Sequence, residues 1–284
     1  MIDTGLKDRT VLITGANHGI GAATAMAFAR QGAHVFITYK RLLYEGSTPS
    51  GPGEALYRTM QAKGPEDVVE AASRVGVRVA AFEADLAEPP AVPAILDRAE
   101  SEIGPIDIFV NNAAHCAPDT FVPAAVSPDR LAPSSYPTRP HTWQSHDRHF
   151  AVNSRATALL IAEFTRRYLA RDARWGRIVS VSTDGADCFP GEVSYGASKA
   201  ALESYTRAAA AELGEYGVTA NIVSLGPVQT GWITPELEAR LIPHIPLRRI
   251  GRPEDVADVI VFLASEQARW VTGQTIFVGG GHRT

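Results

Sequence analysis

The chain has 284 residues, of which 45% are hydrophobic and 20% are charged, so it can bury a large core and most of it cannot be disordered. Its 27 Lys and Arg against 31 Asp and Glu give a formal net charge of −4, which argues against nucleic acid or an anionic membrane as partner. No run approaches the ~18 apolar residues of a membrane span, and the N-terminal residues lack the basic-then-apolar order of a signal peptide. We therefore expect a cytoplasmic protein.

Short β-branched runs alternate with helical stretches along the chain. Strands are expected at 11–13, 34–39, 78–82, 106–110, 177–181, 218–223 and 275–278, and helices at 22–30, 65–74, 153–170, 194–213 and 253–264. Most of these strands are apolar without strict alternation, as expected when helices cover both faces of a sheet. The pattern predicts an α/β fold, a Rossmann-type doubly wound domain with a seven-stranded parallel sheet flanked by helices.

Two stretches rich in proline and glycine interrupt this alternation. They are predicted to be surface insertions at about 40–64 and 115–149. Neither has the length or apolar content of a separate domain, so residues 1–284 are expected to form a single domain. Because the insertions follow the second and fourth strands, they should emerge at the carboxyl edge of the sheet, where ligands bind in such folds.

A glycine-rich segment joins the first strand to the first helix. Residues 14–21 read TGANHGIG, and the amides and dipole of a helix N-terminus at this place favour a phosphate. The spacing differs from the common Gly-x-Gly-x-x-Gly fingerprint. The segment predicts nucleotide binding, with a tight turn as the alternative.

Tyr195 and Lys199 lie four residues apart at the start of a predicted helix, so their side chains share one face. A neighbouring ammonium stabilises a phenolate and lowers a tyrosine pKa from about 10. Tyr195 can then exchange a proton with a substrate oxygen, which typically contributes ~100- to 10,000-fold in rate. Taken alone, such a pair is more often an ordinary amphipathic helix start.

These features, with further motifs in order, resemble the classical short-chain dehydrogenase/reductase family over nearly the whole chain. The motifs are residues 14–21, Asp85-Leu86, Asn111-Asn112-Ala113-Ala114, Asn153, Ser182-Thr183, residues 195–199 (YGASK), residues 272–274 (TGQ) and Gly279-Gly280. The nearest resemblance is to 3-oxoacyl-acyl-carrier-protein reductases. It implies an enzyme that interconverts a ketone and a secondary alcohol by hydride transfer. The alternative is a non-catalytic nucleotide-binding regulatory protein, but such proteins typically lose the Tyr or Lys that is present here.

The resemblance also implies roles for the catalytic residues. Tyr195 would be the general acid or base, Lys199 would bind the nicotinamide ribose and lower the tyrosine pKa, and Asn153 would hold a water that links Lys199 to solvent. The hydroxyl that orients the substrate carbonyl is Ser182 by the usual spacing to the tyrosine. It is Thr183 when the preceding strand is aligned from its start, and both are retained as candidates.

The residues implied to bind the cofactor are spread over the carboxyl ends of the strands. Gly15, Ile20 and Gly21 would wrap the pyrophosphate, and Asp85 and Leu86 would meet the adenine. Asn111 would lie near the adenosine ribose, and the segment after the sixth strand would cover the nicotinamide. The complete set is Gly15, Asn17, His18, Gly19, Ile20, Gly21, Tyr39, Lys40, Arg41, Asp85, Leu86, Asn111, Ala113, Tyr195, Lys199, Gly226, Pro227, Val228 and Thr230.

The end of the second strand favours NADP(H) over NAD(H). NAD-selective enzymes place a carboxylate there to accept from the ribose 2′-hydroxyl, whereas a 2′-phosphate needs a cation. By the resemblance, Tyr39 occupies the usual Asp position and Lys40 the usual Arg position, and Arg41 follows them. The alternative is that these cations merely begin a solvated loop. This alternative is favoured by His18, which stands where many NADP-dependent members of the family carry Arg.

Outside these motifs the sequence predicts a substrate lid over about 231–250 with a helix at 236–242. His141, His146 and His149 are expected to be exposed loop residues rather than metal ligands, so no metal is expected. The two cysteines, Cys116 and Cys188, are expected to be small buried residues. The expected partner is a small carbonyl or alcohol substrate. The family implies a homotetramer built through the helices near Asn153 and Ser194, with a dimer as the alternative.

Overall fold

The computed structural model describes residues 3–43, 51–123 and 138–282. Seven strands form a parallel sheet in the order β3-β2-β1-β4-β7-β8-β9. They are β1 (Thr10–Ile13), β2 (His34–Tyr39), β3 (Val79–Glu83), β4 (Ile108–Asn111), β7 (Gly176–Thr183), β8 (Val218–Leu225) and β9 (Thr275–Val278). The predicted seven-stranded, doubly wound parallel sheet is confirmed.

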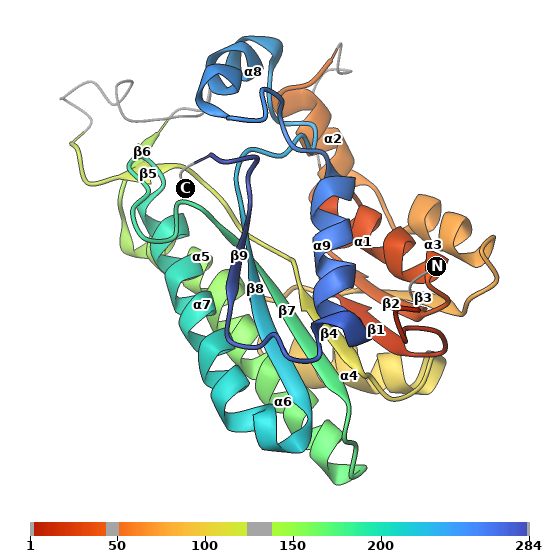
Figure 1. The fold of residues 1–284 in the computed structure, drawn as a ribbon. Helices are drawn as coiled ribbons and strands as arrows, with labels where there is room; N and C mark the ends of the chain where they lie inside the picture. The colour runs from red at the N-terminus through yellow and green to blue at the C-terminus, as the bar shows by residue number, and fades with distance from the viewer. Residues whose placement is uncertain (1–2, 44–50, 124–137, 283–284) are drawn as a thin grey trace.

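Helices cover both faces of this sheet (Figure 1). One face carries α1 (Gly19–Arg30), α3 (Glu66–Ser73) and α9 (Pro253–Ala264), and the other carries α4 (Ala91–Glu102), α6 (Ala156–Ala170) and α7 (Val193–Leu213). The chain builds the sheet outward from β1 to β3 and then returns to place β4 on the other side of β1. The carboxyl ends of β1 and β4 therefore flank the switch point at which doubly wound sheets bind ligands.

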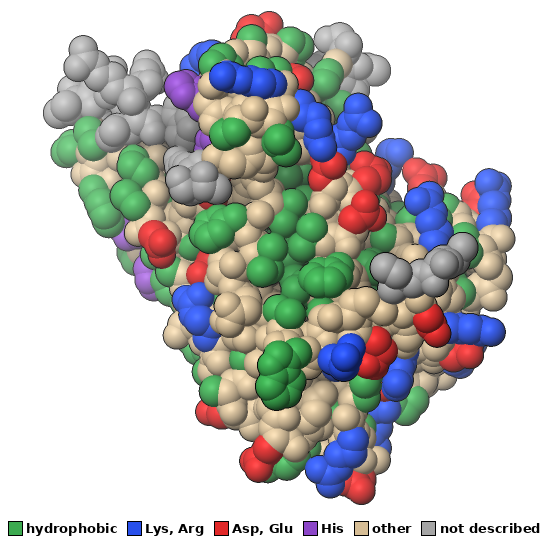
Figure 2. All heavy atoms as spheres, in the orientation of Figure 1, with side chains coloured by type: hydrophobic (Ala, Val, Ile, Leu, Met, Phe, Trp, Pro, Cys, Tyr) green, Lys and Arg blue, Asp and Glu red, His purple; other side chains and the backbone are tan. Residues whose placement is uncertain are grey.

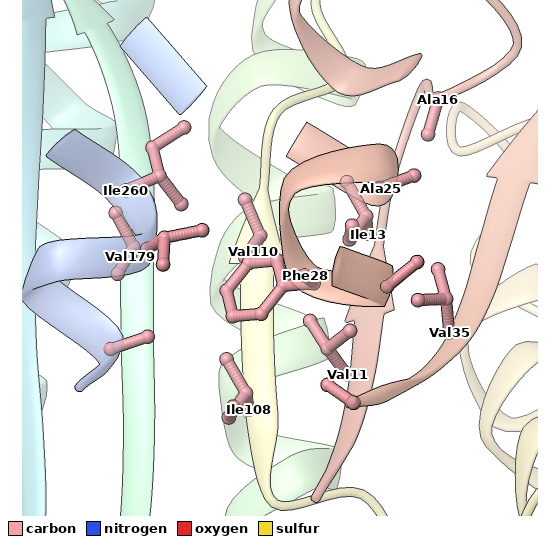
Figure 3. Packing of buried hydrophobic residues seen from close by; sticks show 14 of the residues in the cluster. Val11, Ile13, Ala16, Ala25, Phe28, Val35, Ile108, Val110, Val179 and Ile260 are labelled. Atoms are coloured by element: carbon pink, nitrogen blue, oxygen red, sulfur yellow. The ribbon is translucent and has the colours of Figure 1, made fainter. Parts of the chain in front are cut away.

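The core explains why the strands lack alternation. Phe28 of α1 lies fully buried among side chains of the sheet, including Val110, and Ile260 of α9 belongs to the same cluster (Figure 3). All four residues of β1 are buried. A strand that is covered on both sides has no solvent face for polar residues, so its sequence is a continuous apolar run.

The two predicted insertions contain secondary structure that the sequence did not predict. The first holds α2 (Glu54–Ala62), and the second holds α5 (Trp143–Phe150) and two short paired strands, β5 (Asp119–Thr120) and β6 (Arg139–Pro140). Residues 44–50 and 124–137 of these insertions lie outside the described residues. Both α2 and the β5-β6 pair lie beyond the carboxyl edge of the sheet (Figure 1), as predicted from their place after β2 and β4.

The predicted lid contains α8 (Pro235–Leu241), which begins with a hydrogen bond from the Leu237 amide to the Thr234 hydroxyl (3.2 Å). Ile233, Leu237, Ile245 and Ile250 form a small apolar cluster of their own in this segment. Among the described helices, none is both long and apolar enough to cross a bilayer.

Candidate active site

The glycine segment after β1 forms a tight cradle against the end of β4. Gly15 has a φ of +64°, and a Cβ there would lie 2.8 Å from the Cα of Ala113. A Cβ on Gly21 would lie 2.7 Å from the Cα of Ala16. The Thr14 hydroxyl accepts from the Ala113 amide (3.0 Å) and fixes the two strand ends together. Only glycine fits at these two positions, so the chain can pack this closely between β1, the start of α1 and the end of β4.

Two further residues of the cradle, Asn17 and His18, contact a segment that is distant in sequence. The Asn17 side chain donates to the carbonyl of Lys63 (2.8 Å), just after α2. The His18 ring meets the Tyr57 ring of α2 edge-on, with 5.9 Å between centroids. Burial lowers the pKa of His18, and its buried Nδ1 has no hydrogen-bond partner among the described residues. The first insertion thus packs directly on the predicted phosphate loop.

The segment after β8 closes the other side of the cradle. A Cβ on Gly19 would lie 3.2 Å from the methyl group of Thr230, and the Pro227 carbonyl accepts from the Gly251 amide (3.0 Å). Val228 forms a parallel bridge with Gly251, and a Cβ on Gly226 would lie 2.8 Å from the Cα of Gly279. The residues assigned to the nicotinamide end therefore lie beside those assigned to the pyrophosphate.

At the end of β2 the two predicted phosphate-binding cations are already paired. Lys40 forms an ion pair with Asp85, and Arg41 donates from Nε to Glu83 Oε2 (2.9 Å). Although burial acts in the opposite direction, the hydrogen bond from Lys40 holds the pKa of Asp85 below its usual value. All four side chains are a third or more exposed, and exposed pairs contribute only ~0–1 kcal/mol. Exchanging a carboxylate partner for a phosphate therefore costs little.

Two other residues assigned to the adenosine end lie inside the protein. Leu86 is buried in the cluster beneath α4. The Asn111 amide is buried and donates to the Thr157 hydroxyl (2.7 Å), which in turn donates to the carbonyl of Asn153 (2.7 Å). The contact of Asn111 with a ribose stays a prediction, and the observed role of its side chain is to link β4 to α6.

Asn153 lies in a π-helical turn, Ala151–Arg155, that leads into α6. Its side chain is fully buried and makes three hydrogen bonds. Oδ1 accepts from the His115 amide (2.8 Å), and Nδ2 donates to the His115 carbonyl (2.8 Å) and to the Ser198 hydroxyl (2.9 Å). The Ser198 hydroxyl donates to the carbonyl of Tyr195 (2.8 Å). Asn153 therefore joins the segment after β4 to the first turns of α7.

Lys199 and Tyr195 lie together at the carboxyl edge of β7. Lys199 is only 1% exposed, and its Nζ donates to the carbonyl of Val181 (2.7 Å). Burial lowers the pKa of Lys199 to about 8. Its Nζ lies 5.9 Å from the centroid of the Tyr195 ring. The predicted proximity of the two side chains is therefore present.

The predicted direction of the tyrosine pKa is wrong for the protein by itself. Burial raises the pKa of Tyr195 well above its ordinary value, and the nearby Cys116 and Glu192 raise it further. These effects outweigh the ammonium, which is directed at the Val181 carbonyl. Tyr195 is consequently a protonated phenol at neutral pH, which is the form that can donate a proton.

The two candidate hydroxyls lie on opposite faces of β7 because they are adjacent in a strand. Ser182 donates to Glu203 Oε1 of α7 (2.7 Å) and is buried in that pair. The Thr183 hydroxyl accepts from the Gly185 amide (3.2 Å), and among the described residues its own proton has no acceptor. Thr183 is thus the hydroxyl of the two that has a proton left to donate.

Two expectations outside the motifs are corrected. Cys116 and Cys188 are exposed, not buried. His149 is fully buried in α5, where its Nδ1 bonds to the Ser145 carbonyl (2.7 Å) and its Nε2 accepts from the Ala117 amide (3.1 Å). Burial lowers the pKa of His149, so His149 is a neutral structural residue of the second insertion.

Sequence reasoning gave no role to three residues near Tyr195, which are Cys116, Asp119 and Glu192. Cys116 donates to Glu192 (3.4 Å), and Asp119 accepts from the amide of Ser194, the residue that precedes Tyr195. None lies in a recognisable motif. The signal available for Asp119 was its place five residues after the Asn111-to-Ala114 motif, at the start of a proline-rich insertion.

A glycine cradle at the switch point of a doubly wound sheet and an adjacent Tyr-Lys pair define the class as nicotinamide-dependent oxidoreductases. Comparisons with known proteins agree with this class. The family model described as Enoyl-(Acyl carrier protein) reductase matches residues 53–283, and the short chain dehydrogenase model matches residues 9–46.

Individual relatives match over almost their whole length. The Bacillus subtilis protein named uncharacterized oxidoreductase YjdA is 34% identical over 97% of each chain. The 3-oxoacyl-[acyl-carrier-protein] reductase FabG of Staphylococcus aureus is 31% identical over 96% of this chain and 97% of its own. The crystal structure of the angucycline C-6 ketoreductase LanV with bound NADP superposes with a TM-score of 0.77 at 29% identity, covering 98% of this chain and 96% of that one.

The chain belongs to the short-chain dehydrogenase/reductase family. It is an oxidoreductase that acts on CH–OH and C=O groups with a nicotinamide cofactor.

Proposed function

We propose that this enzyme is an NADP(H)-dependent reductase that interconverts a ketone and a secondary alcohol. The observation that carries the proposal is the position of the Tyr195 ring, 5.9 Å from Nζ of the buried Lys199, at the carboxyl edge of the sheet. A protonated acid is what carbonyl reduction requires, because the oxygen gains a proton as the carbon gains a hydride.

The residues present fit a dinucleotide. The cradle at Gly15 and Gly21 has no room for a Cβ at either position, and the buried Nδ1 of His18 has no partner in the described part of the chain. Residues 15–21 would hold the pyrophosphate, Lys199 the nicotinamide ribose, and residues 226–230 the nicotinamide. When bound, the nicotinamide supplies a hydride to the substrate carbon or takes one from it.

The chain's own side chains perform the proton chemistry. Thr183 donates a hydrogen bond to the substrate oxygen and orients it, because the Ser182 hydroxyl is committed to Glu203. Tyr195 gives its phenolic proton to that oxygen in reduction and accepts a proton in the reverse oxidation. Lys199 stays fixed by the Val181 carbonyl, and Asn153 holds the turn of α7 that carries both residues.

The preference for NADP(H) rests on charge at the end of β2. Tyr39 offers no carboxylate there, and Lys40 and Arg41 are exposed cations whose present partners, Asp85 and Glu83, can be exchanged for a phosphate. Titrating the protein separately with NADPH and NADH tests this preference by the fluorescence of the bound cofactor. We expect tighter binding of NADPH, and tighter binding of NADH would contradict the proposal.

The substrate is proposed to be a small carbonyl compound or the corresponding alcohol. NADPH oxidation is to be followed against acyl thioesters, sugars, steroids, quinones and small diketones. Turnover of at least one carbonyl class is expected, and binding of NADPH without turnover of any member would contradict the proposed reaction.

We propose a homotetramer, because two separate faces expose apolar side chains. On one, Leu159 of α6 and Tyr205 of α7 line a hollow of about 390 Å³. On the other, hydrophobic side chains gather over α9 and β9 (Figure 2), where Phe262 and Phe277 are exposed. Two self-complementary faces build a tetramer, whereas one builds a dimer. Light scattering of the purified protein should give the mass of four chains, and Leu159→Arg should reduce it to two.

We further propose that residues 1–284 form one domain and that the first insertion controls access to its site. The Gly53 amide at the start of α2 donates to the Gly231 carbonyl at the start of the lid (2.7 Å). Since Asn17 bonds to Lys63 just after α2 and His18 meets Tyr57 of α2, the first insertion bridges the phosphate cradle and the lid.

A further inference from the structure

Asp119, in the second insertion, is a buried carboxylate with four donors around it. It is 2% exposed. Its Oδ1 accepts from the Ser194 amide (2.9 Å), and its Oδ2 accepts from the Ser194 hydroxyl, from the Ser145 hydroxyl (2.8 Å) and from His141 Nδ1 (3.1 Å). A buried charge with this many hydrogen bonds holds its surroundings in one arrangement, because breaking any bond leaves a buried polar group unsatisfied.

Ser194 is the second residue of α7 and directly precedes Tyr195. The first amides of a helix have no partner within the helix, and the residue at the N-cap position, Glu192, makes no side-chain capping bond. Asp119 supplies this cap from a segment 75 positions away. Its negative charge also lies at the positive end of the α7 dipole, where a carboxylate is stabilising.

Lys199 is held by a different contact. Its Nζ is tied to the Val181 carbonyl of β7, while Tyr195 lies one turn earlier, in the turn that Asp119 caps. The spacing between the phenol and the ammonium therefore depends on contacts in three places: Val181 in the sheet, Asn153 through the Ser198 hydroxyl, and Asp119 in the insertion. Loss of the Asp119 contact would release the first amides of α7 just before Tyr195, while the Val181 carbonyl still holds Lys199.

We propose that Asp119 is a positioning residue that fixes the phenol of Tyr195 for proton transfer by capping the catalytic helix from the second insertion. This inference rests on the proposed function of Tyr195. The insertion after β4, which contains none of the family motifs, thereby has a role in catalysis.

Asp119→Asn keeps the shape of the side chain, removes the charge and replaces one of its two acceptor oxygens by a donor. We expect kcat for carbonyl reduction to fall about 100-fold, since a displacement near 1 Å has an effect of that order. KM and the Kd for NADPH should stay within threefold, because the cradle and Lys40 do not touch Asp119. Asp172→Asn, which changes an exposed aspartate paired with Arg174, is the matched control and should behave as wild type.

Ser194→Ala removes one of the hydroxyl donors and keeps the amide bond to Asp119, so it should lower kcat by a smaller factor. It also serves if Asp119→Asn does not fold. The inference is overturned if folded Asp119→Asn keeps kcat within threefold of wild type, or if Ser194→Ala is the only folded variant and leaves kcat unchanged.

A measurement that does not need turnover separates this inference from the proposed function. The Cζ carbon of tyrosine is labelled with ¹³C, and the Tyr195 signal is assigned from its loss in Tyr195→Phe. Asp119→Asn, or Ser194→Ala in its place, should shift this signal and its titration, whereas Asp172→Asn should not. An unchanged Tyr195 signal overturns the role of Asp119, while a shifted signal in an enzyme that reduces no carbonyl supports that role and contradicts the proposed reaction.

Discussion

Replacing Lys199 by Met should make the protein more stable at neutral pH and inactive. Burial lowers the pKa of Lys199 from 10.5 to about 8. A shift of that size corresponds to about 3 kcal/mol of unfavourable free energy for keeping the ammonium charged in the folded state. The hydrogen bond from Lys199 to the Val181 carbonyl stabilises the folded state by about 1 kcal/mol and offsets part of this cost. Lys199→Met should therefore raise the free energy of unfolding by about 2 kcal/mol at pH 7.

The sign of the pH dependence follows from the lowered pKa. Between pH ~8 and ~10.5 the unfolded chain binds the Lys199 proton and the folded protein does not, so wild-type stability should rise with pH through this window. The difference in free energy of unfolding between Lys199→Met and wild type should therefore disappear by pH ~10.

Urea unfolding at pH 7 and pH 10, at one fixed protein concentration, measures both effects. Lys63→Met, which removes an exposed lysine paired with Asp67, is the control and should change stability by less than ~0.5 kcal/mol. A Lys199→Met protein that is less stable than wild type at pH 7, or equally stabilised at both pH values, would show that burial of the Lys199 ammonium is not destabilising.

Three further predictions follow from the site. Thr183→Val should lower kcat by about 100-fold because it removes a donor to the substrate oxygen, and Ser182→Ala should lower it by less than about tenfold; equal losses in steady-state kinetics would contradict the assignment. Lys40→Ala should weaken NADPH binding by about tenfold and leave NADH binding nearly unchanged, as measured by cofactor titration. Since the pKa of Tyr195 is raised, alcohol oxidation should accelerate with rising pH while carbonyl reduction should not; the opposite trend would count against Tyr195 as the proton donor.

The strands and several helices could be predicted because their sequence patterns are local. The residues of β2, α9 and β9 match the predicted ranges, since each is an apolar or periodic run with a clear end. Helix α4 was missed although Val92, Ile95, Leu96 and Ala99 are buried on one face. Prolines before and within its first turn obscured it, and proline is tolerated at that place in a helix.

The residues of the site likewise divide into those that local motifs predict and those that only the fold brings together. The cradle and the Tyr-Lys pair depend on short motifs, and the structure brings their residues to one edge of the sheet. The raised pKa of Tyr195 could not be predicted, because it arises from burial and from Cys116 and Glu192, which surround the phenol only after folding. The role of Asp119 could not be predicted either, because its partner Ser194 is 75 positions away in the sequence.

The proposed function depends on proton transfer by Tyr195 in NADPH-dependent carbonyl reduction. Comparing wild type with Tyr195→Phe, which deletes only the hydroxyl group, measures this step. We expect the affinity for NADPH to be unchanged and kcat to be lower by a factor of ~100 to 10,000. Turnover by Tyr195→Phe at the wild-type rate, with NADPH bound equally well, would contradict this role of Tyr195.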